Sequence, residues 1–206
     1  MKQFYEENKL EVGIDEVARG CLAGRVYTAA VIWPPNLEDE EIHPLLRDSK
    51  KLSRKQRNIV KEYIEDTAID FAIGYESPEN IDKFNILNAT HMAMHNAIKN
   101  LNVEPESIIA DGNVFKPYYN SDKDLIPHRC FVGGDNKYAS IAAASILAKV
   151  YHDNYIDELC DQNPDLERYG WRSNMCYGTQ EHIEAISKYG LSEYHRKTFG
   201  ICKNFI

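Results

Sequence analysis

The feature that most constrains the fold is a long helical pattern over residues 140–160, SIAAASILAKVYHDNYIDELC. Its first half consists almost entirely of alanine and aliphatic residues. A helix that is apolar on all sides must be covered on all sides, unlike an amphipathic surface helix. We therefore expect this helix to pack centrally on a β-sheet.

Strand and helix patterns alternate along the rest of the chain. Apolar runs typical of strands occupy residues 10–15, 26–33, 70–75, 107–111 and 128–134. Helical patterns occupy residues 55–67, with Ser53 as N-cap, and residues 86–101 and 180–188. The first two strands are predicted to form a hairpin, whereas helices separate the later ones, so we expect an α/β fold with a mixed sheet. Residues 115–129 are expected to form a surface loop.

The net charge, the cysteines and the apolar runs of the sequence argue against several classes of protein. The formal net charge of −8 argues against a strong nonspecific nucleic-acid binder, although residues 47–57 hold six basic residues against one Asp. The five cysteines are scattered without a C-x-x-C pair, which argues against a disulfide framework or a zinc ribbon. Neither a signal-peptide pattern nor an apolar run long enough for a membrane span is present, so we expect a cytoplasmic protein without a membrane partner.

Three predicted strand ends each carry a carboxylate: Asp15 with its neighbour Glu16, Asp111, and Asp135. In an open α/β sheet such ends gather along one edge, where sites commonly form. Converging carboxylates repel one another unless cations hold them, and an oxygen-rich cluster without thiols suits Mg²⁺ or Mn²⁺. Two such ions are the usual means of cleaving phosphodiesters, one activating water and the other stabilising the leaving oxygen.

Each acid also has an ordinary structural interpretation. Asp111 precedes a glycine in a turn, and Asp135 precedes a helix that it could cap. The adjacent pair Asp15-Glu16 is harder to explain, because a continuing strand would send the two side chains to opposite faces. Either the strand ends there or both acids reach a charged partner. The pattern alone leaves both the metal site and the structural roles open.

Seven segments between residues 13 and 199 carry a family resemblance: GIDEVARGCLAGRVYTAAVI, DSKKLS, NILNAT, IIADGN, GGDNKYASIAAASILAKV, YGTQEH and HRKTF. In this order they resemble the motifs of type 2 ribonuclease H, the ribonuclease HII family. The resemblance implies a ribonuclease-H-like catalytic domain over residues 1–165 and a C-terminal helical extension over residues 166–206. It also implies a monomeric endonuclease that cleaves the RNA strand of RNA–DNA hybrids and nicks duplex DNA 5′ to embedded ribonucleotides. Such an enzyme uses Mg²⁺ or Mn²⁺ and leaves 3′-hydroxyl and 5′-phosphate ends.

The resemblance also assigns site residues. The catalytic, metal-holding acids fall on Asp15, Glu16, Asp111 and Asp135. The substrate contacts fall on Ala18, Arg19, Gly20, Ser49, Lys50, Lys51, Ser140 and Tyr177. The tyrosine is implied to stack on the sugar next to the cleaved bond, and the turn at residues 18–20 is implied to approach the ribose 2′-hydroxyl.

Two departures of this chain from the family pattern concern the predicted substrate contacts. Ala18 stands where the resemblance implies glycine, and it would strain the turn if that position needs a positive φ. Asn174, Met175 and Cys176 stand where relatives typically have His-Lys-Gly.

The substrate contacts also have ordinary interpretations: a core tyrosine at Tyr177, a solvated charge run around Lys50, and an N-cap at Ser140. The pair His91 and His95 is expected to have a core or surface role rather than to bind metal. His182, His195 and Arg196 match family positions without an assigned role.

Two other functions compete with the ribonuclease. One is a non-catalytic module that binds RNA–DNA hybrids, and the other is a different two-metal nuclease such as a junction resolvase. A phosphate-loop nucleotide-binding protein is the weakest alternative, because no G-x-x-x-x-G-K-[ST] run occurs.

Overall fold

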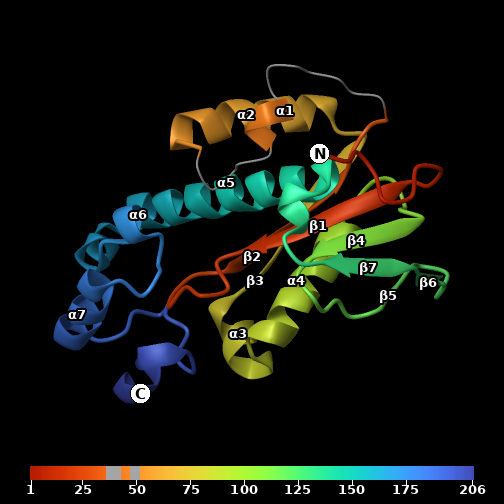
Figure 1. Ribbon diagram of the computed structural model, residues 1–206. Helices are drawn as coiled ribbons and strands as arrows, with labels where there is room; N and C mark the ends of the chain where they lie inside the picture. The colour runs from red at the N-terminus through yellow and green to blue at the C-terminus, as the bar shows by residue number, and fades with distance from the viewer. Residues whose placement is uncertain (36–42, 47–51) are drawn as a thin grey trace.

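The computed structural model describes residues 1–35, 43–46 and 52–206 of the chain. Its centre is a five-stranded sheet in the order β3-β2-β1-β4-β7 (Figure 1). The strands are β1 (Glu11–Val17), β2 (Val26–Ile32), β3 (Asp70–Glu76), β4 (Ser107–Asp111) and β7 (His128–Phe131). β1 pairs antiparallel with β2 and parallel with β4, and β7 continues the sheet parallel to β4. The predicted mixed sheet, with a hairpin as its first two strands, is therefore confirmed.

Helices cover both faces of this sheet. The long helix α5 (Ala139–Gln162), α2 (Arg54–Thr67) and the short α1 (His43–Leu46) lie on one face, whereas α3 (Pro78–Phe84) and α4 (Ile86–Lys99) lie on the other (Figure 1). Along β2, Ala29 and Val31 join the core under α5, while Ala30 and Ile32 join the core under α4. This alternation follows from the two-residue period of a strand. The central position predicted for the long helix is confirmed.

Helix α2 begins as its sequence predicts. The Ser53 hydroxyl accepts a hydrogen bond from the backbone N–H of Gln56, and the Gln56 side chain accepts one from the backbone N–H of Ser53. This capping box satisfies two donors that the helix cannot satisfy itself. The N-cap fixes where α2 starts, and so fixes which of its side chains face α5.

The first turn of α5 lies very close to β1. A Cβ added at Gly13 would lie 2.4 Å from the carbonyl carbon and from the hydroxyl of Ser140, so only glycine fits there. Ser140 is 1% exposed and does not line the cavity that holds the acids. The structure thus places Ser140 against the sheet, and a phosphate contact by its hydroxyl is not supported.

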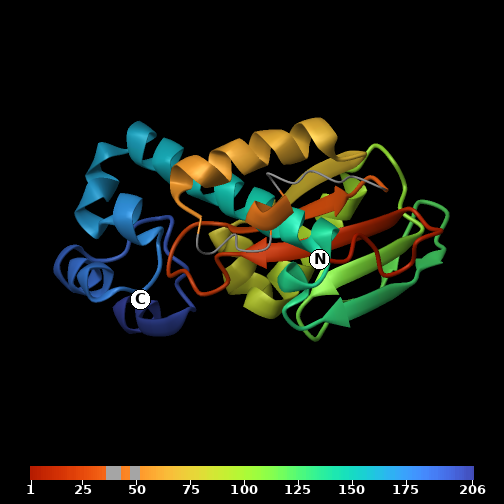
Figure 2. The same cartoon turned by 45° about the horizontal axis from the view of Figure 1, so that its top comes forward.

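The C-terminal segment packs at the end of the sheet where β1 finishes (Figure 2). It contains the 3₁₀ helices η2 (Pro164–Tyr169) and η3 (Gly200–Phe205) and the helices α6 (Trp171–Asn174) and α7 (Gln180–Tyr189). Trp171, Cys176 and Ile186 share one apolar core with Ala18 and Leu22, which follow β1. The predicted boundary between residues 165 and 166 falls within η2, and we propose that both parts fold as one unit.

The prediction of a surface loop over residues 115–129 is right about the surface, where most of these residues are exposed, and wrong about the absence of regular structure. This segment contains a small hairpin, β5 (Tyr118–Tyr119) with β6 (Leu125–Ile126), and the start of β7. Phe115 and Ile126 are buried in the core under α4. These two apolar side chains anchor the segment to the sheet, because burying them removes apolar surface from water.

The strand expected over residues 128–134 ends early, at Phe131. Gly133 has φ +65°, and the chain then enters the 3₁₀ helix η1 (Gly134–Asn136).

In the described ranges, none of the helices is long and apolar enough to cross a membrane.

Candidate active site

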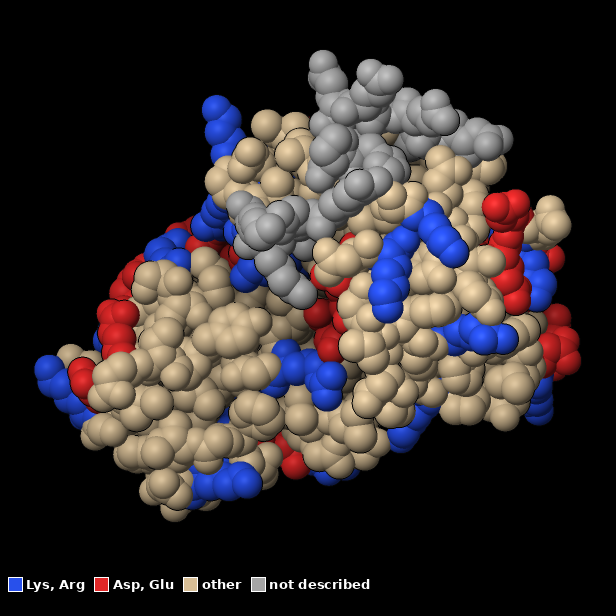
Figure 3. All heavy atoms as spheres, viewed as in Figure 1, with Lys and Arg blue, Asp and Glu red and all other residues tan. Residues whose placement is uncertain are grey.

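Two neighbouring parallel strands bring the predicted acids together. Ile14 of β1 lies beside Ala110 of β4, and Asp15 and Asp111 follow these residues directly. A cavity of about 450 Å³ opens at this end of the strands, lined by Asp15, Glu16, Val17, Ala18, Arg19, Gly20, Arg57, Asp111, Ser145, Lys149 and Tyr177. Figure 3 shows acidic side chains recessed near the middle of this face, with basic side chains around them. Three of the four predicted acids therefore share one cavity.

Asp15 is the most buried acid in this cavity. Its Oδ1 accepts a hydrogen bond of 2.7 Å from the backbone N–H of Glu16, and its carboxylate is hydrogen-bonded to the Ser145 side chain of α5. Burial, followed by the negative charges of Glu16 and Asp111, raises the pKa of Asp15 well above its ordinary value. Like charges in a desolvated site disfavour ionisation unless a cation is present.

The position and contacts of Glu16 show how β1 accommodates two adjacent acids. The strand does not end at Asp15 but continues to Val17, so the prediction that it covers only residues 10–15 is wrong. Glu16 Oε1 lies 3.0 Å from Nη1 of Arg19, so it has a charged partner. Burial raises the pKa of Glu16, Arg19 lowers it, and Asp111 raises it again. Of the two alternatives, the strand end is wrong, and the charged partner is found for Glu16 alone, because Asp15 contacts the Ser145 hydroxyl.

Asp135 lies next to the cavity rather than in its lining. The backbone N–H of Gly134 donates a 2.7 Å hydrogen bond to Asp111 Oδ1, which places the residue before Asp135 against this acid. Asp135 is 8% exposed, and its Oδ1 accepts a hydrogen bond from Asn136 Nδ2.

The donor set consists of carboxylates without thiols, which suits Mg²⁺ or Mn²⁺. Within residues 1–35, 43–46 and 52–206, no three His, Cys, Asp or Glu side chains already form a group that could hold an ion. Glu16 is paired with Arg19, and Asp111 accepts from the backbone N–H of Gly134.

In the turn after β1, Ala18 has the positive φ that a glycine at this position would adopt without strain. Ala18 has φ +69° and is 2% exposed. A residue with a Cβ in the left-handed region carries a penalty of about 1–2 kcal/mol. An ideal Cβ at Gly20 would lie 3.7 Å from the Tyr177 ring, so the turn and the tyrosine are in contact.

Replacing Ala18 with Gly is expected to raise the free energy of unfolding by about 0.5–1 kcal/mol, because the strain of the positive φ exceeds the entropy that glycine adds to the unfolded chain. Urea unfolding measures this change. The control is Ala23→Gly, in the same connection but without a positive φ, where a loss of stability is expected. Equal destabilisation by both substitutions would contradict strain at Ala18.

Tyr177 reaches the cavity on a strained segment of its own. Its side chain is 38% exposed, and Met175 and Cys176 before it have φ +48° and +64°. The backbone N–H of Leu22 donates a 2.8 Å hydrogen bond to the carbonyl of Cys176, which ties the segment to the connection after β1. Burial raises the pKa of Tyr177 to about 12, so its ring stays neutral at physiological pH.

Two histidines without an assigned role, His182 and His195, form a chain of hydrogen bonds that ends at the backbone carbonyl of Tyr177. His182 Nδ1 donates to the carbonyl of Tyr177 over 3.0 Å, so His182 Nε2 is left as the acceptor. This atom accepts from Trp171 Nε1 at 3.0 Å and from His195 Nε2 at 3.1 Å. The backbone N–H of Ser192 donates to His195 Nδ1. Burial lowers the pKa of both rings, that of His195 to about 3, so both are neutral and the chain of hydrogen bonds is complete.

The histidines at positions 91 and 95 each contact a backbone carbonyl of the segment after β4. His91 Nε2 lies 3.3 Å from the carbonyl of Val114, and His95 Nε2 lies 3.0 Å from the carbonyl of Lys116. Both rings therefore fasten the segment after β4 to α4, and the predicted structural role is confirmed.

Three polar residues of the cavity had no predicted role: Ser145, Arg57 and Lys149. Ser145 and Lys149 are spaced i,i+4 on α5 and so lie on one side of it, which is the signal that could have found them. Arg57 belongs to the basic stretch noted in the sequence. The predicted contacts Ser49, Lys50 and Lys51 lie outside the described residues.

The sequence model of ribonuclease HII matches residues 12–202. The chain belongs to the ribonuclease HII family. It is 50% identical over 196 residues to ribonuclease HII of Parabacteroides distasonis, covering 95% of this chain and 92% of the relative. It is 49% identical over 198 residues to the Bacteroides fragilis enzyme, covering 96% and 92%.

Solved structures share the fold. Ribonuclease H2 from Pyrococcus horikoshii superimposes with a TM-score of 0.72 at 21% identity, covering 95% of this chain and 96% of that chain. A ribonuclease HIII, named Bst-RNase HIII and crystallised in complex with Mn²⁺, gives a TM-score of 0.68 at 20% identity, covering 94% and 68%. The sheet and its helices are thus a ribonuclease-H-like fold, as predicted.

Membership of the ribonuclease HII family makes this chain a ribonuclease H, a hydrolytic endonuclease that acts on RNA–DNA hybrids. The competing hypotheses of a non-catalytic binding module and of a junction resolvase are not supported by this assignment.

Proposed function

We propose that this ribonuclease HII cleaves the RNA strand of RNA–DNA hybrids and nicks duplex DNA 5′ to embedded ribonucleotides, leaving 3′-hydroxyl and 5′-phosphate ends. It acts as a monomer and requires Mg²⁺ or Mn²⁺. The observation that carries the proposal is the meeting of Asp15, Glu16 and Asp111 in one cavity with Tyr177 and the turn at Ala18.

Each group has a task in this proposal. Asp15, Glu16, Asp111 and Asp135 hold the metal ions. When bound, such ions supply Lewis-acid activation of water and stabilise the leaving oxygen. The backbone of the turn at residues 18–20 approaches the ribose 2′-hydroxyl, which distinguishes RNA from DNA. The half-exposed ring of Tyr177 offers an apolar face on which the neighbouring sugar packs.

The test uses end-labelled duplex DNA with one ribonucleotide, beside a full RNA–DNA hybrid, with Mg²⁺, Mn²⁺ or EDTA. We expect metal-dependent nicking 5′ to the ribonucleotide and cleavage of the hybrid. Asp135→Asn is expected to lose both cleavages while binding remains. Cleavage of the hybrid alone would reject ribonucleotide nicking and point to the Ala18 turn, and cleavage in EDTA would reject the metal requirement.

A further inference from the structure

Asp135 lies in a part of the chain that has little stability of its own. η1 is a single turn of 3₁₀ helix, and Gly133 before it has φ +65°. Val132, next to that glycine, is 69% exposed. Short 3₁₀ turns and glycines leave the backbone many other conformations. Besides the hydrogen bond between Gly134 and Asp111, the position of Asp135 therefore depends on contacts made on either side of η1.

The backbone of Lys2 holds the chain after η1. Lys2 and Tyr138 form a parallel β-bridge. The N–H of Lys2 donates to the carbonyl of Lys137, and the carbonyl of Lys2 accepts from the N–H of Ala139, both over 2.9 Å. Ala139 is the first residue of α5, and the N-cap residue Tyr138 makes no side-chain capping bond. Lys2 thus satisfies a donor that a helix leaves unpaired at its start, and it fixes where α5 begins.

The ring of Tyr5 holds the chain before η1. Its centroid lies 5.2 Å from that of Phe131, the last residue of β7, and 6.3 Å from that of Tyr138. The rings of Phe131 and Tyr138 are themselves 4.7 Å apart. The guanidinium of Arg129 lies over the Tyr5 ring, 5.0 Å from its centroid. Tyr5 thus completes a cluster of three rings whose other two members stand on either side of η1 in the sequence.

Glu11 of β1 supports the backbone of Tyr5. Its carboxylate accepts from the backbone N–H groups of Tyr5 and Glu6. Neither bond reaches the chain around η1, whose contacts come from the backbone of Lys2 and the ring of Tyr5 instead. A substitution at Glu11 that keeps one of these bonds is therefore expected to leave the contacts around η1 in place.

We propose that residues 2–5 position Asp135: the backbone of Lys2 and the ring of Tyr5 fix the chain on both sides of η1, and so hold the Asp135 carboxylate beside the cavity. The proposal rests on the proposed function, in which this carboxylate holds a metal ion. Residues 2–5 precede the first segment of the family resemblance, which begins at residue 13, so the resemblance assigns them no part in the site. Neither Lys2 nor Tyr5 lines the cavity, so both act through Asp135 rather than on the substrate.

The expected effect is on the requirement for metal. A carboxylate that is in place for only part of the time lowers the apparent affinity for an ion by that fraction, but the ion in excess restores the competent state. Groups that orient metal ligands change metal affinity by about 10- to 100-fold. Loosening η1 should therefore raise the Mg²⁺ concentration that cleavage needs more than it lowers the maximal rate.

The first test measures cleavage of the hybrid as a function of Mg²⁺ concentration. For Tyr5→Ala we expect the half-saturating concentration to rise about tenfold, with the maximal rate within about threefold of the wild type. Tyr5→Phe keeps the ring and should restore the wild-type value. Tyr189→Ala is the matched control, because this tyrosine of α7 is 44% exposed and has Arg168 over its ring. An equal rise in the control, or a lower maximal rate without a change in the Mg²⁺ requirement, would overturn the positioning role of Tyr5.

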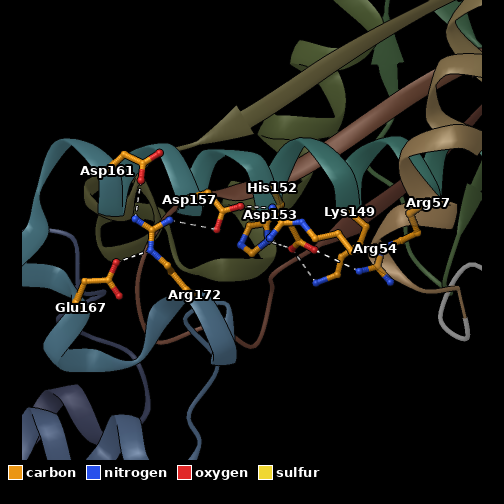
Figure 4. Close-up of polar contacts among 9 residues, drawn as sticks. All are labelled: Arg54, Arg57, Lys149, His152, Asp153, Asp157, Asp161, Glu167 and Arg172. Atoms are coloured by element: carbon orange, nitrogen blue, oxygen red, sulfur yellow. Dashed lines mark hydrogen bonds and ion pairs between the residues drawn. The ribbon is translucent and has the colours of Figure 1, made fainter.

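The bridge is tested at Lys2, where the backbone makes the contact. Lys2→Pro removes the N–H that donates to Lys137 and should also raise the Mg²⁺ requirement, whereas Lys2→Ala keeps both backbone groups and should not. Asp157→Asn changes a contact farther along α5, with Arg54 and Arg172 (Figure 4), and should leave the requirement unchanged. The same Mg²⁺ requirement in Lys2→Pro and Lys2→Ala would overturn the part assigned to the bridge.

A second measurement needs no cleavage. Mg²⁺ raises the unfolding temperature of a protein that binds it only in the folded state. We expect Tyr5→Ala to reduce this rise in the wild type but not in Asp135→Asn, because the two residues act as one unit. Equal reductions in both backgrounds would overturn positioning through Asp135. A wild-type protein that cuts neither substrate would defeat the proposed function, while these unfolding temperatures would still decide the positioning.

Discussion

Replacing Asp15 with Asn is expected to lower cleavage at least about a thousandfold and, at the same time, to stabilise the metal-free protein. Asp15 is 6% exposed and lies with Glu16 and Asp111 in one cavity. Its raised pKa records the unfavourable free energy of holding this charge without a cation. An amide of the same shape removes the repulsion, so a gain of about 0.5–2 kcal/mol in the free energy of unfolding is expected.

Thermal unfolding in EDTA and in Mg²⁺ measures the second effect. Mg²⁺ should raise the unfolding temperature of the wild type, because it binds only the folded state, and should raise that of Asp15→Asn much less. Glu11→Gln is the matched control on the same strand. Glu11 is 1% exposed, and burial raises its pKa as well. Its two oxygens, however, accept from the backbone N–H groups of Tyr5 and Glu6, and the amide of Gln can accept only one of these bonds, so this variant should destabilise the protein and spare cleavage. A metal-free Asp15→Asn protein that is less stable than the wild type would contradict the electrostatic account.

Replacing Arg196 with Ala is expected to cost about 3–5 kcal/mol of stability, the largest loss that any substitution discussed for this chain should cause. The side chain is 0% exposed. Its Nε, Nη1 and Nη2 donate to the carbonyls of Gly24, Arg19 and Arg25 over 3.0, 3.1 and 3.1 Å. One guanidinium thus fastens the C-terminal segment to the whole connection between β1 and β2. Without it, three backbone carbonyls, of which that of Gly24 is buried, lose their donors.

Urea unfolding measures this loss, and cleavage should fall as well, because the carbonyl of Arg19 belongs to the turn that lines the cavity. Arg196→Lys is expected to recover only part of the stability, since an ammonium cannot reproduce the planar fork. The neighbouring Lys197 is exposed, and Lys197→Gln should change stability by no more than about 0.5 kcal/mol. An Arg196→Ala protein as stable as the Lys197→Gln control would show that these three hydrogen bonds contribute little.

The sequence by itself determined the features that local periodicity encodes. The apolar first half of α5 predicted a helix packed on a sheet, the alternation in residues 10–15 and 26–33 predicted the first hairpin, and Ser53 predicted the start of α2. It also placed Asp111 at the end of its strand, whereas β1 continues two residues past Asp15; the parallel pairing of β1 and β4 brings both acids together. These predictions depend on neighbours within a few residues, which a sequence displays directly.

Only the tertiary structure decided which distant side chains meet. Ser140 and Ser145 are on one helix, but the close packing of Gly13 buries the first, while the second contacts Asp15. Arg196 finds its three acceptors more than 170 residues earlier in the chain. The positive φ of Ala18 and Cys176 has no local signal, because neither residue favours it and the packing of the C-terminal segment imposes it. Burial and hydrogen bonding between remote segments set these features, and they arise only when the chain is folded.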